Sequence, residues 1–189
     1  MRAEKTRAAR DAYNALSRDV GALLSLWNGH ETPATSLGEA LATDSLASNR
    51  LVELVERSDD VHSTREALVR RLTHFILEDR RVQEAAAAFT SANAEALGAL
   101  AADSQRDAEV LLQNQIPETM ELVAAARRIG AIGASAFGAG FGGSVWAVVE
   151  RDAARHFPAR WLEACRPGCP PDAAAFEAAP APPLMLLQA

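Results

Sequence analysis

A cluster of four glycines near position 140 restricts the fold of this chain more than any other sequence feature. The cluster reads Gly138-Ala139-Gly140-Phe141-Gly142-Gly143. Glycine loses more conformational entropy on folding than other residues, so such a cluster needs a physical reason. Two interpretations are open. The first is a tight turn in which side chains would clash. The second is a loop whose backbone closely approaches a ligand or another backbone segment, with N–H groups available to anionic oxygens.

The residues on either side of the glycines predict strands. Ser144–Val149 is a continuous apolar run rich in β-branched residues, which predicts a buried strand. A short strand over Gly133–Phe137 would give the order strand, glycine loop, strand. We expect a final strand at Ala173–Ala179. The familiar G-x-G-x-x-G dinucleotide motif should open a helix, so a strand after the glycines argues against it.

Helical periodicity dominates the rest of the chain. The expected helices are 6–27, 45–57, a long helix from 63 that carries Val82 and Phe89, 92–102, 116–129, and 152–165 with a break at Pro158. Ser63 and Glu66 match a capping box for the long helix. Met120 and Val123 form the apolar set of the helix that Gly130 ends, and Asp152 is the expected cap of the last helix. Helices followed by strands predict an α+β fold, with an antiparallel sheet covered by helices on one face.

Composition excludes two classes of function. The net charge of −6 and pI near 5.3 provide no basic surface for nucleic acid. The uncharged stretch Gly130–Val149 is long enough for a membrane span, but its six glycines disfavour a helix there. At 189 residues the chain is expected to form a single domain, 1–189, without nucleic-acid or membrane partners.

Two side-chain pairs raise the question of a metal. Cys165 and Cys169 with His156 could hold zinc, but two free thiols are the favoured interpretation, and so few cysteines indicate a reducing, cytoplasmic location. His74 and Glu78 have the i,i+4 spacing of metal ligands, but a helix-surface pair is favoured because no third ligand is evident. We expect no metal site in this chain.

Taken together, these segments resemble galactokinases of the GHMP kinase superfamily. The third signature of that family is similar to the run from Ile116-Pro117-Glu118 through Gly130 and Gly133-Ala134 to the glycine cluster and Ser144-Val145. Upstream similarities in the same order are Tyr13-Asn14, His74, Glu78, Arg81-Val82, Leu97-Gly98, Leu100 and Ser104. The resemblance covers most of the chain and implies the C-terminal, ferredoxin-like half of a sugar kinase.

The resemblance also implies roles for individual residues. The six residues of the glycine cluster would line the nucleotide cleft: Gly138, Ala139, Gly140, Phe141, Gly142 and Gly143. Tyr13 would contact the sugar, although a helix-surface tyrosine is an equally open interpretation. The family uses ATP and Mg²⁺, and its phosphate loop, metal site and catalytic groups belong to an N-terminal half that is absent here. We therefore expect no catalytic residue and no turnover by this chain alone.

The chain departs from the family pattern at five places, one of which is the ending Ala181-Pro182-Pro183, where the expected glycine is missing. Gln105 replaces a histidine, Ser135 and Phe137 replace an arginine and a threonine, and Ser144 replaces a cysteine. Two functions stay open. The chain is either the C-terminal domain of a kinase that phosphorylates a monosaccharide, completed by a separate N-terminal half, or a non-catalytic binding, dimerisation or regulatory module. The apolar tail Leu184–Leu187 favours a partner or a homo-oligomer.

Overall fold

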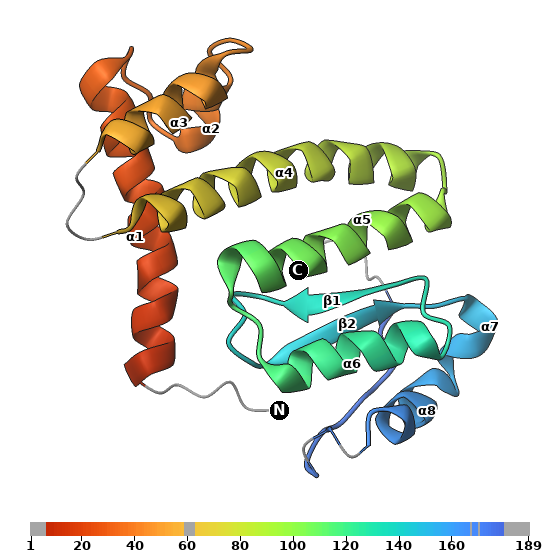
Figure 1. The fold of residues 1–189 in the computed structure, drawn as a ribbon. Helices are drawn as coiled ribbons and strands as arrows, with labels where there is room; N and C mark the ends of the chain where they lie inside the picture. The colour runs from red at the N-terminus through yellow and green to blue at the C-terminus, as the bar shows by residue number, and fades with distance from the viewer. Residues whose placement is uncertain (1–6, 59–62, 167, 170, 180–189) are drawn as a thin grey trace, which may run out of the picture.

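The computed structural model describes residues 7–58, 63–166, 168–169 and 171–179 (Figure 1). Its elements are α1 (Arg7–His30), α2 (Leu37–Leu41), α3 (Ala47–Arg57), α4 (Arg65–Thr90), α5 (Ala94–Asp107), the π-helical turn η1 (Ala108–Leu112), α6 (Pro117–Arg128), β1 (Gly133–Phe137), β2 (Ser144–Val148), α7 (Arg151–Ala154) and α8 (Phe157–Ala164). The predicted α+β class with an antiparallel sheet is confirmed. The order strand, glycine loop, strand is observed with the predicted bounds of β1. The tail Leu184–Leu187 lies outside the described residues.

Helices α1 to α4 share one apolar core. Its fully buried members are Leu23 and Trp27 of α1, Leu51 and Val55 of α3, and Leu68 and Leu72 of α4. The Trp27 indole N–H donates to the Thr32 carbonyl at 2.9 Å, which fixes the chain where it leaves α1. In Figure 1, α1 crosses one end of α4, and α2 and α3 fill the angle between them.

The β hairpin carries the second core and has helices on both of its faces, whereas the sequence predicted helices on one face. Ala134 of β1 points to the face that packs on Val123 of α6 and Trp161 of α8. On the opposite face Gly133 lies against Gly98 of α5. A Cβ atom on Gly98 would lie 2.1 Å from the Ile132 carbonyl oxygen, so only glycine permits this approach. Figure 1 shows α5 above the hairpin and α6 below it.

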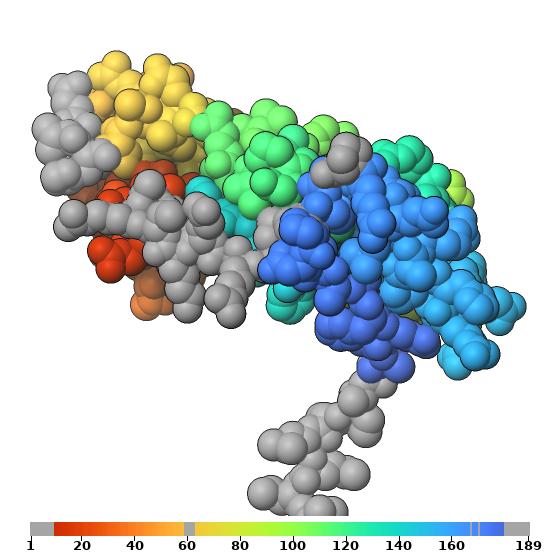
Figure 2. All heavy atoms as spheres, turned by 90° about the horizontal axis from the view of Figure 1, so that it is seen from below, coloured from red at the N-terminus to blue at the C-terminus, as the bar shows by residue number. Residues whose placement is uncertain are grey.

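Helix α8 closes the lower side of this second core. The Trp161 indole N–H donates to the Leu122 carbonyl of α6 at 2.8 Å. Seen from below in Figure 2, α8 and the segment 171–179 form the surface at one end of the molecule, and α1 lies at the other end. No helix among the described residues is long and apolar enough to cross a membrane.

A buried arginine joins α4 to α5. The Arg81 guanidinium, in a residue only 8% exposed, bonds Asp107 of α5 and Glu78 of its own helix. The Ser104 hydroxyl donates to Glu78 at 3.0 Å. Burial alone would lower the pKa of Arg81, but the hydrogen bonds to Asp107 and Glu78 outweigh it and raise the pKa. This network holds the two helices in register, and Glu78 has no free oxygen pair for a metal.

Several predictions at helix ends are wrong. Thr64, not Ser63, caps α4 by accepting from the Ala67 N–H, and Ser63 instead donates to the buried Asp19. Glu150 occupies the N-cap of α7, which places Asp152 in the first turn. The predicted break is present, because α7 ends before α8 begins with Pro158 in its first turn.

Other predictions of burial are also wrong. Val82 and Phe89, expected on the inner face of α4, are 68% and 71% exposed because α5 packs beside them rather than over them. Met120 is exposed on α6. Trp146 and Val148 of β2 are also partly exposed, because α5 covers β1 but not β2. The segment Ala173–Ala179 forms no strand; its Ala175 packs against the second core instead.

The network around Arg81 generates the first prediction. Arg81→Met should lower the free energy of unfolding by about 2 to 4 kcal/mol, because Asp107 would stay nearly buried without its cation. Arg106→Met is the matched control, since Arg106 pairs with Asp103 on the surface. It should cost less than about 1 kcal/mol. Urea unfolding followed by circular dichroism measures both variants. Equal losses in the free energy of unfolding would show that the buried ion pair stabilises the protein no more than the surface pair does.

Candidate functional site

The loop between β1 and β2 has an unusual backbone. Its φ angles are positive at Gly138 (86°), Gly140 (80°), Phe141 (59°), Gly142 (104°) and Gly143 (102°). Residues other than glycine avoid this left-handed region, so Phe141 is held there by its surroundings. The glycine cluster is therefore required by conformation, as the sequence predicted.

Buried Asn114 supplies the surroundings that hold the loop. The π-helical turn η1 ends at Leu112, and Gln113, which follows it, lies in the left-handed region and turns Asn114 toward the loop. The Asn114 side-chain amide donates to the Ala139 carbonyl at 3.1 Å, and the Phe141 N–H donates to the Asn114 carbonyl at 2.5 Å. A Cβ atom on Gly140 would lie 2.3 Å from that carbonyl oxygen. The close approach that explains Gly140 is thus to the chain's own backbone.

The other side of the loop is open. A Cβ atom at Gly138 or Gly143 would meet nothing within 4 Å. In Figure 1 the loop lies at the end of the hairpin nearer to α1. A loop clamped on one side and open on the other has room for a ligand to approach its backbone N–H groups. Runs of backbone N–H groups in such conformations bind anionic oxygens.

Gln105 is a supporting residue that sequence reasoning noted only as a departure from the family. It is buried, and its side-chain oxygen accepts from the Ser135 hydroxyl at 3.0 Å and from the Ala136 N–H at 2.8 Å. Its amide nitrogen donates to Glu109 at 2.8 Å. Gln105 therefore ties α5 to β1 just before the glycine loop. Gln105 and Ser135 both depart from the family pattern, and they contact each other here. A joint change at these two positions is the sequence signal that could have revealed this contact.

Tyr13, the predicted sugar contact, lies on the exposed part of α1. Its side chain is 48% exposed, and α1 packs against α2, α3 and α4 in the described structure. The glycine loop and Tyr13 come from segments that share no packed core. The exposure of Tyr13 leaves its side chain available to a ligand.

The residues considered for metals do not form a site. No group of three or more histidine, cysteine, aspartate or glutamate side chains among the described residues could hold an ion. Glu78 is occupied by Arg81 and Ser104. His74 is half-buried on α4; burial lowers its pKa, and the neighbouring Glu78 only partly opposes this shift.

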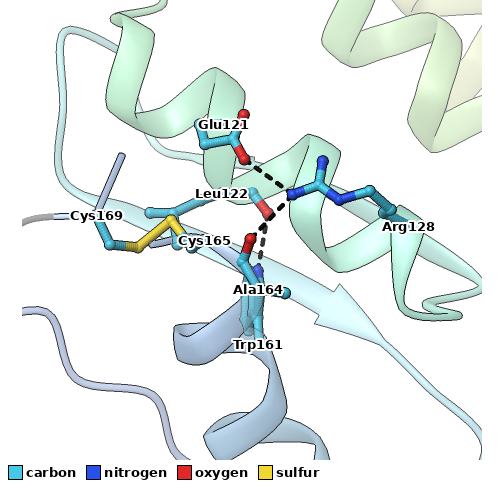
Figure 3. Close-up of a disulfide and its surroundings, with 7 residues drawn as sticks. All are labelled: Glu121, Leu122, Arg128, Trp161, Ala164, Cys165 and Cys169. Carbon is cyan, nitrogen blue, oxygen red and sulfur yellow. Dashed lines mark hydrogen bonds and ion pairs between the residues drawn. A yellow bond between two sulfur atoms is a disulfide. The ribbon is translucent and has the colours of Figure 1, made fainter. Parts of the chain in front are cut away.

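The prediction of free thiols is wrong. Cys165 and Cys169 form a disulfide, with Cα atoms 5.4 Å apart at the end of α8 (Figure 3). The turn that ends the helix brings the two residues together, because the Cys169 N–H donates to the Cys165 carbonyl at 3.1 Å. Beside them Arg128 donates to Glu121 and to the Ala164 carbonyl, both at 3.0 Å. These contacts fasten the end of α8 to α6.

Comparison with known proteins matches part of the chain to a family model. Residues 85–166 match the family model described as GHMP kinases C terminal. This segment contains α5, α6, the hairpin and α8. It therefore includes the whole glycine loop, residues 138–143, which Asn114 holds in place and which we call the clamped loop. No curated protein sequence matches the chain.

A solved structure extends the comparison. The crystal structure of Lactococcus lactis galactokinase complexed with galactose has a similar fold, with a TM-score of 0.67 and 23% sequence identity. The similarity covers 87% of this chain and 39% of that chain. Residues 85–166 thus match GHMP kinases C terminal, and the fold over 87% of the chain is similar to that of a galactokinase, in agreement with the resemblance seen in the sequence.

The contact between Gly140 and Asn114 gives a second prediction. Gly140→Ala should destabilise the protein by about 2 to 5 kcal/mol, because it adds a backbone clash to the left-handed strain. Gly138→Ala is the matched control with a similar φ and free space, and should cost about 1 to 2 kcal/mol. Urea unfolding measures the difference, and amide hydrogen exchange at Phe141 should rise only in Gly140→Ala. Identical behaviour of the two variants would contradict the clamp.

Burial of His74 gives a third prediction. Its pKa is lowered in the folded protein, so the unfolded chain binds this proton at higher pH. The free energy of unfolding should therefore fall as pH drops below about 6.5, the ordinary histidine value. His74→Gln should reduce this loss between pH 7.5 and 5.5 in urea unfolding. His156→Gln replaces an exposed histidine as the control, and an undiminished loss in His74→Gln would refute the prediction.

Proposed function

We propose that this chain is the C-terminal domain of a galactokinase-like kinase that transfers phosphate from MgATP to a monosaccharide. The observation that carries the proposal is the clamped glycine loop, open on one side, within the segment that matches GHMP kinases C terminal. Residues 1–189 would act as one domain. The chain spans only 39% of the galactokinase that it resembles, so the rest of the enzyme would come from another part or another chain.

In this proposal the loop residues 138–143 bind the nucleotide through their backbone. The N–H groups on the open side would contact phosphate oxygens, and Asn114 and Gln105 would hold the loop in place before the nucleotide arrives. Preorganised donors need no rearrangement during the reaction, which is how they lower a barrier that depends on developing charge. Tyr13 would contact a sugar hydroxyl.

The described residues suit ATP phosphates but not the metal. Backbone N–H groups are suitable donors to phosphate, whereas Mg²⁺ prefers carboxylates, and no acidic cluster is present in the described part of the chain. When bound, Mg²⁺ neutralises charge on the phosphates during transfer. We therefore assign the metal ligands and the catalytic groups to the complementary part of the enzyme.

Release of ADP from MgATP with a panel of monosaccharides, galactose foremost, tests the proposal. The purified chain alone should be inactive, and adding the polypeptide encoded directly upstream of Met1 should produce turnover. In the completed enzyme Gly140→Val should lower kcat/KM by about 100-fold, because a small displacement of positioning groups has effects of that size. Gly21→Ala, on α1 where the added Cβ meets nothing, should keep full activity.

Three outcomes would count against this assignment. Full activity of folded Gly140→Val would remove the loop from the cleft. Turnover by the chain alone would show that the catalytic groups are within it. Continued inactivity with the upstream polypeptide bound would favour the non-catalytic module instead.

A further inference from the structure

The disulfide between Cys165 and Cys169 is a covalent feature that the proposed function does not use. These are the only two cysteines of the chain, so the pair has two intramolecular states, a disulfide and a dithiol. The bond closes a loop with a sequence separation of only 4. A cross-link stabilises a protein less when it closes a shorter loop, so this bond should act on the local turn more than on the whole fold.

The turn that carries the two cysteines is also held by contacts that do not involve sulfur. The Cys169 N–H donates to the Cys165 carbonyl at 3.1 Å. Gly168 lies so close to α6 that a Cβ atom on it would be 2.9 Å from Cγ of Glu121. Arg128 of α6 donates to the last carbonyl of α8, beside the disulfide (Figure 3). Because these contacts remain after reduction, the two thiols would stay close enough to form the bond again.

The two cysteines differ in exposure. Cys165 is 1% exposed and belongs to the second core, whereas Cys169 is half-buried and packs against that core. A thiolate in solution would therefore attack Sγ of Cys169, and Sγ of Cys165 would leave with the electron pair of the S–S bond. Cys165 would then take up a proton, because an apolar core disfavours a charged sulfur atom.

Helix α6 connects the disulfide with the clamped loop. Leu122 of α6 packs in the same core as Cys165. Earlier in the same helix the buried Thr119 hydroxyl donates to the Gln115 side-chain oxygen at 3.2 Å. The Gln115 amide donates to the side-chain oxygen of Asn114 at 2.9 Å, and Asn114 holds the loop. The end of α8 is thus joined to the loop by a continuous series of packed and hydrogen-bonded groups.

We propose that Cys165 and Cys169 form a reversible thiol–disulfide switch whose closure holds α8 on α6 and thereby tightens the clamped loop. A dithiol reductant opens it by supplying two electrons. Its first thiolate forms a mixed disulfide with Cys169, and its second thiol attacks that mixed disulfide, so the reductant leaves oxidised and both cysteines become thiols. Glutathione disulfide, as the oxidant, reverses the step. In the reduced protein only the non-covalent contacts hold the turn, so it opens more often.

Amide hydrogen exchange of the purified chain, before and after treatment with dithiothreitol, tests the inference. Iodoacetamide labelling and mass spectrometry count the free thiols in each sample. Reduction should raise the exchange rate about tenfold at Cys169 and about threefold at Phe141, whose N–H donates to Asn114. Glutathione disulfide should restore both rates. The Val55 amide, in the separate core of α1 to α4, should not change.

Cys169→Ser is the matched control, because it removes the bond and leaves Cys165 as a thiol. The exchange rate at Phe141 in this variant should equal that of the reduced wild-type chain, with or without dithiothreitol. The substitution falls on a half-buried residue and should leave the fold intact. The reduced wild-type chain gives the same information if the variant does not fold.

Other outcomes overturn the inference. A disulfide that dithiothreitol cannot open, or opens only together with faster exchange at Val55, is a permanent part of the fold. Faster exchange at Cys169 with an unchanged rate at Phe141 would break the link to the loop. Disulfide-linked dimers after reoxidation would show that the cysteines pair between chains. These measurements use no nucleotide or sugar, so failure of the proposed function, which ADP release tests, is seen separately.

Discussion

The contact of Gly98 with the chain at Ile132 and Gly133 determines how the helical part of the molecule meets the sheet. Any side chain at position 98 would collide with the Ile132 carbonyl, so α5 reaches β1 at backbone distance only because glycine is present. That approach brings Gln105, two turns further along α5, within hydrogen-bond distance of Ser135 and Ala136. The ion pair between Arg81 of α4 and Asp107 of α5 then fixes α4 relative to α5. A single close contact thus sets the place of both helices relative to the glycine loop.

The same contact leaves β2 uncovered. Helix α5 packs on β1, whereas α6 on the opposite face packs on both strands. Trp146 and Val148 consequently face solvent although their sequence is that of a buried strand. The exposure of Trp146 and Val148 therefore follows from the packing of α5 on β1, and not from a local irregularity of β2.

Sequence patterns were sufficient where local conformation decides the structure. Gly133–Phe137 and the positive φ angles of the glycine cluster followed from strand propensity and from the properties of glycine. They were insufficient where distant contacts decide it. Nothing in the periodicity of α4 shows that Phe89 lies beside α5 rather than under it, and nothing near Asn114 shows that its carbonyl meets Phe141. The disulfide between Cys165 and Cys169 depends on a turn after α8 that spacing alone did not distinguish from a free loop.

The geometry of β2 connects the packing of α5 with the glycine loop. Val148 pairs with Gly133 at one end of the hairpin and Ser144 pairs with Phe137 beside the glycine loop, so the five residues of this strand span the distance between the two features. A strand advances about 3.4 Å per residue, so the position that Gly98 gives to one end of the hairpin also fixes the position of the glycine loop at the other end.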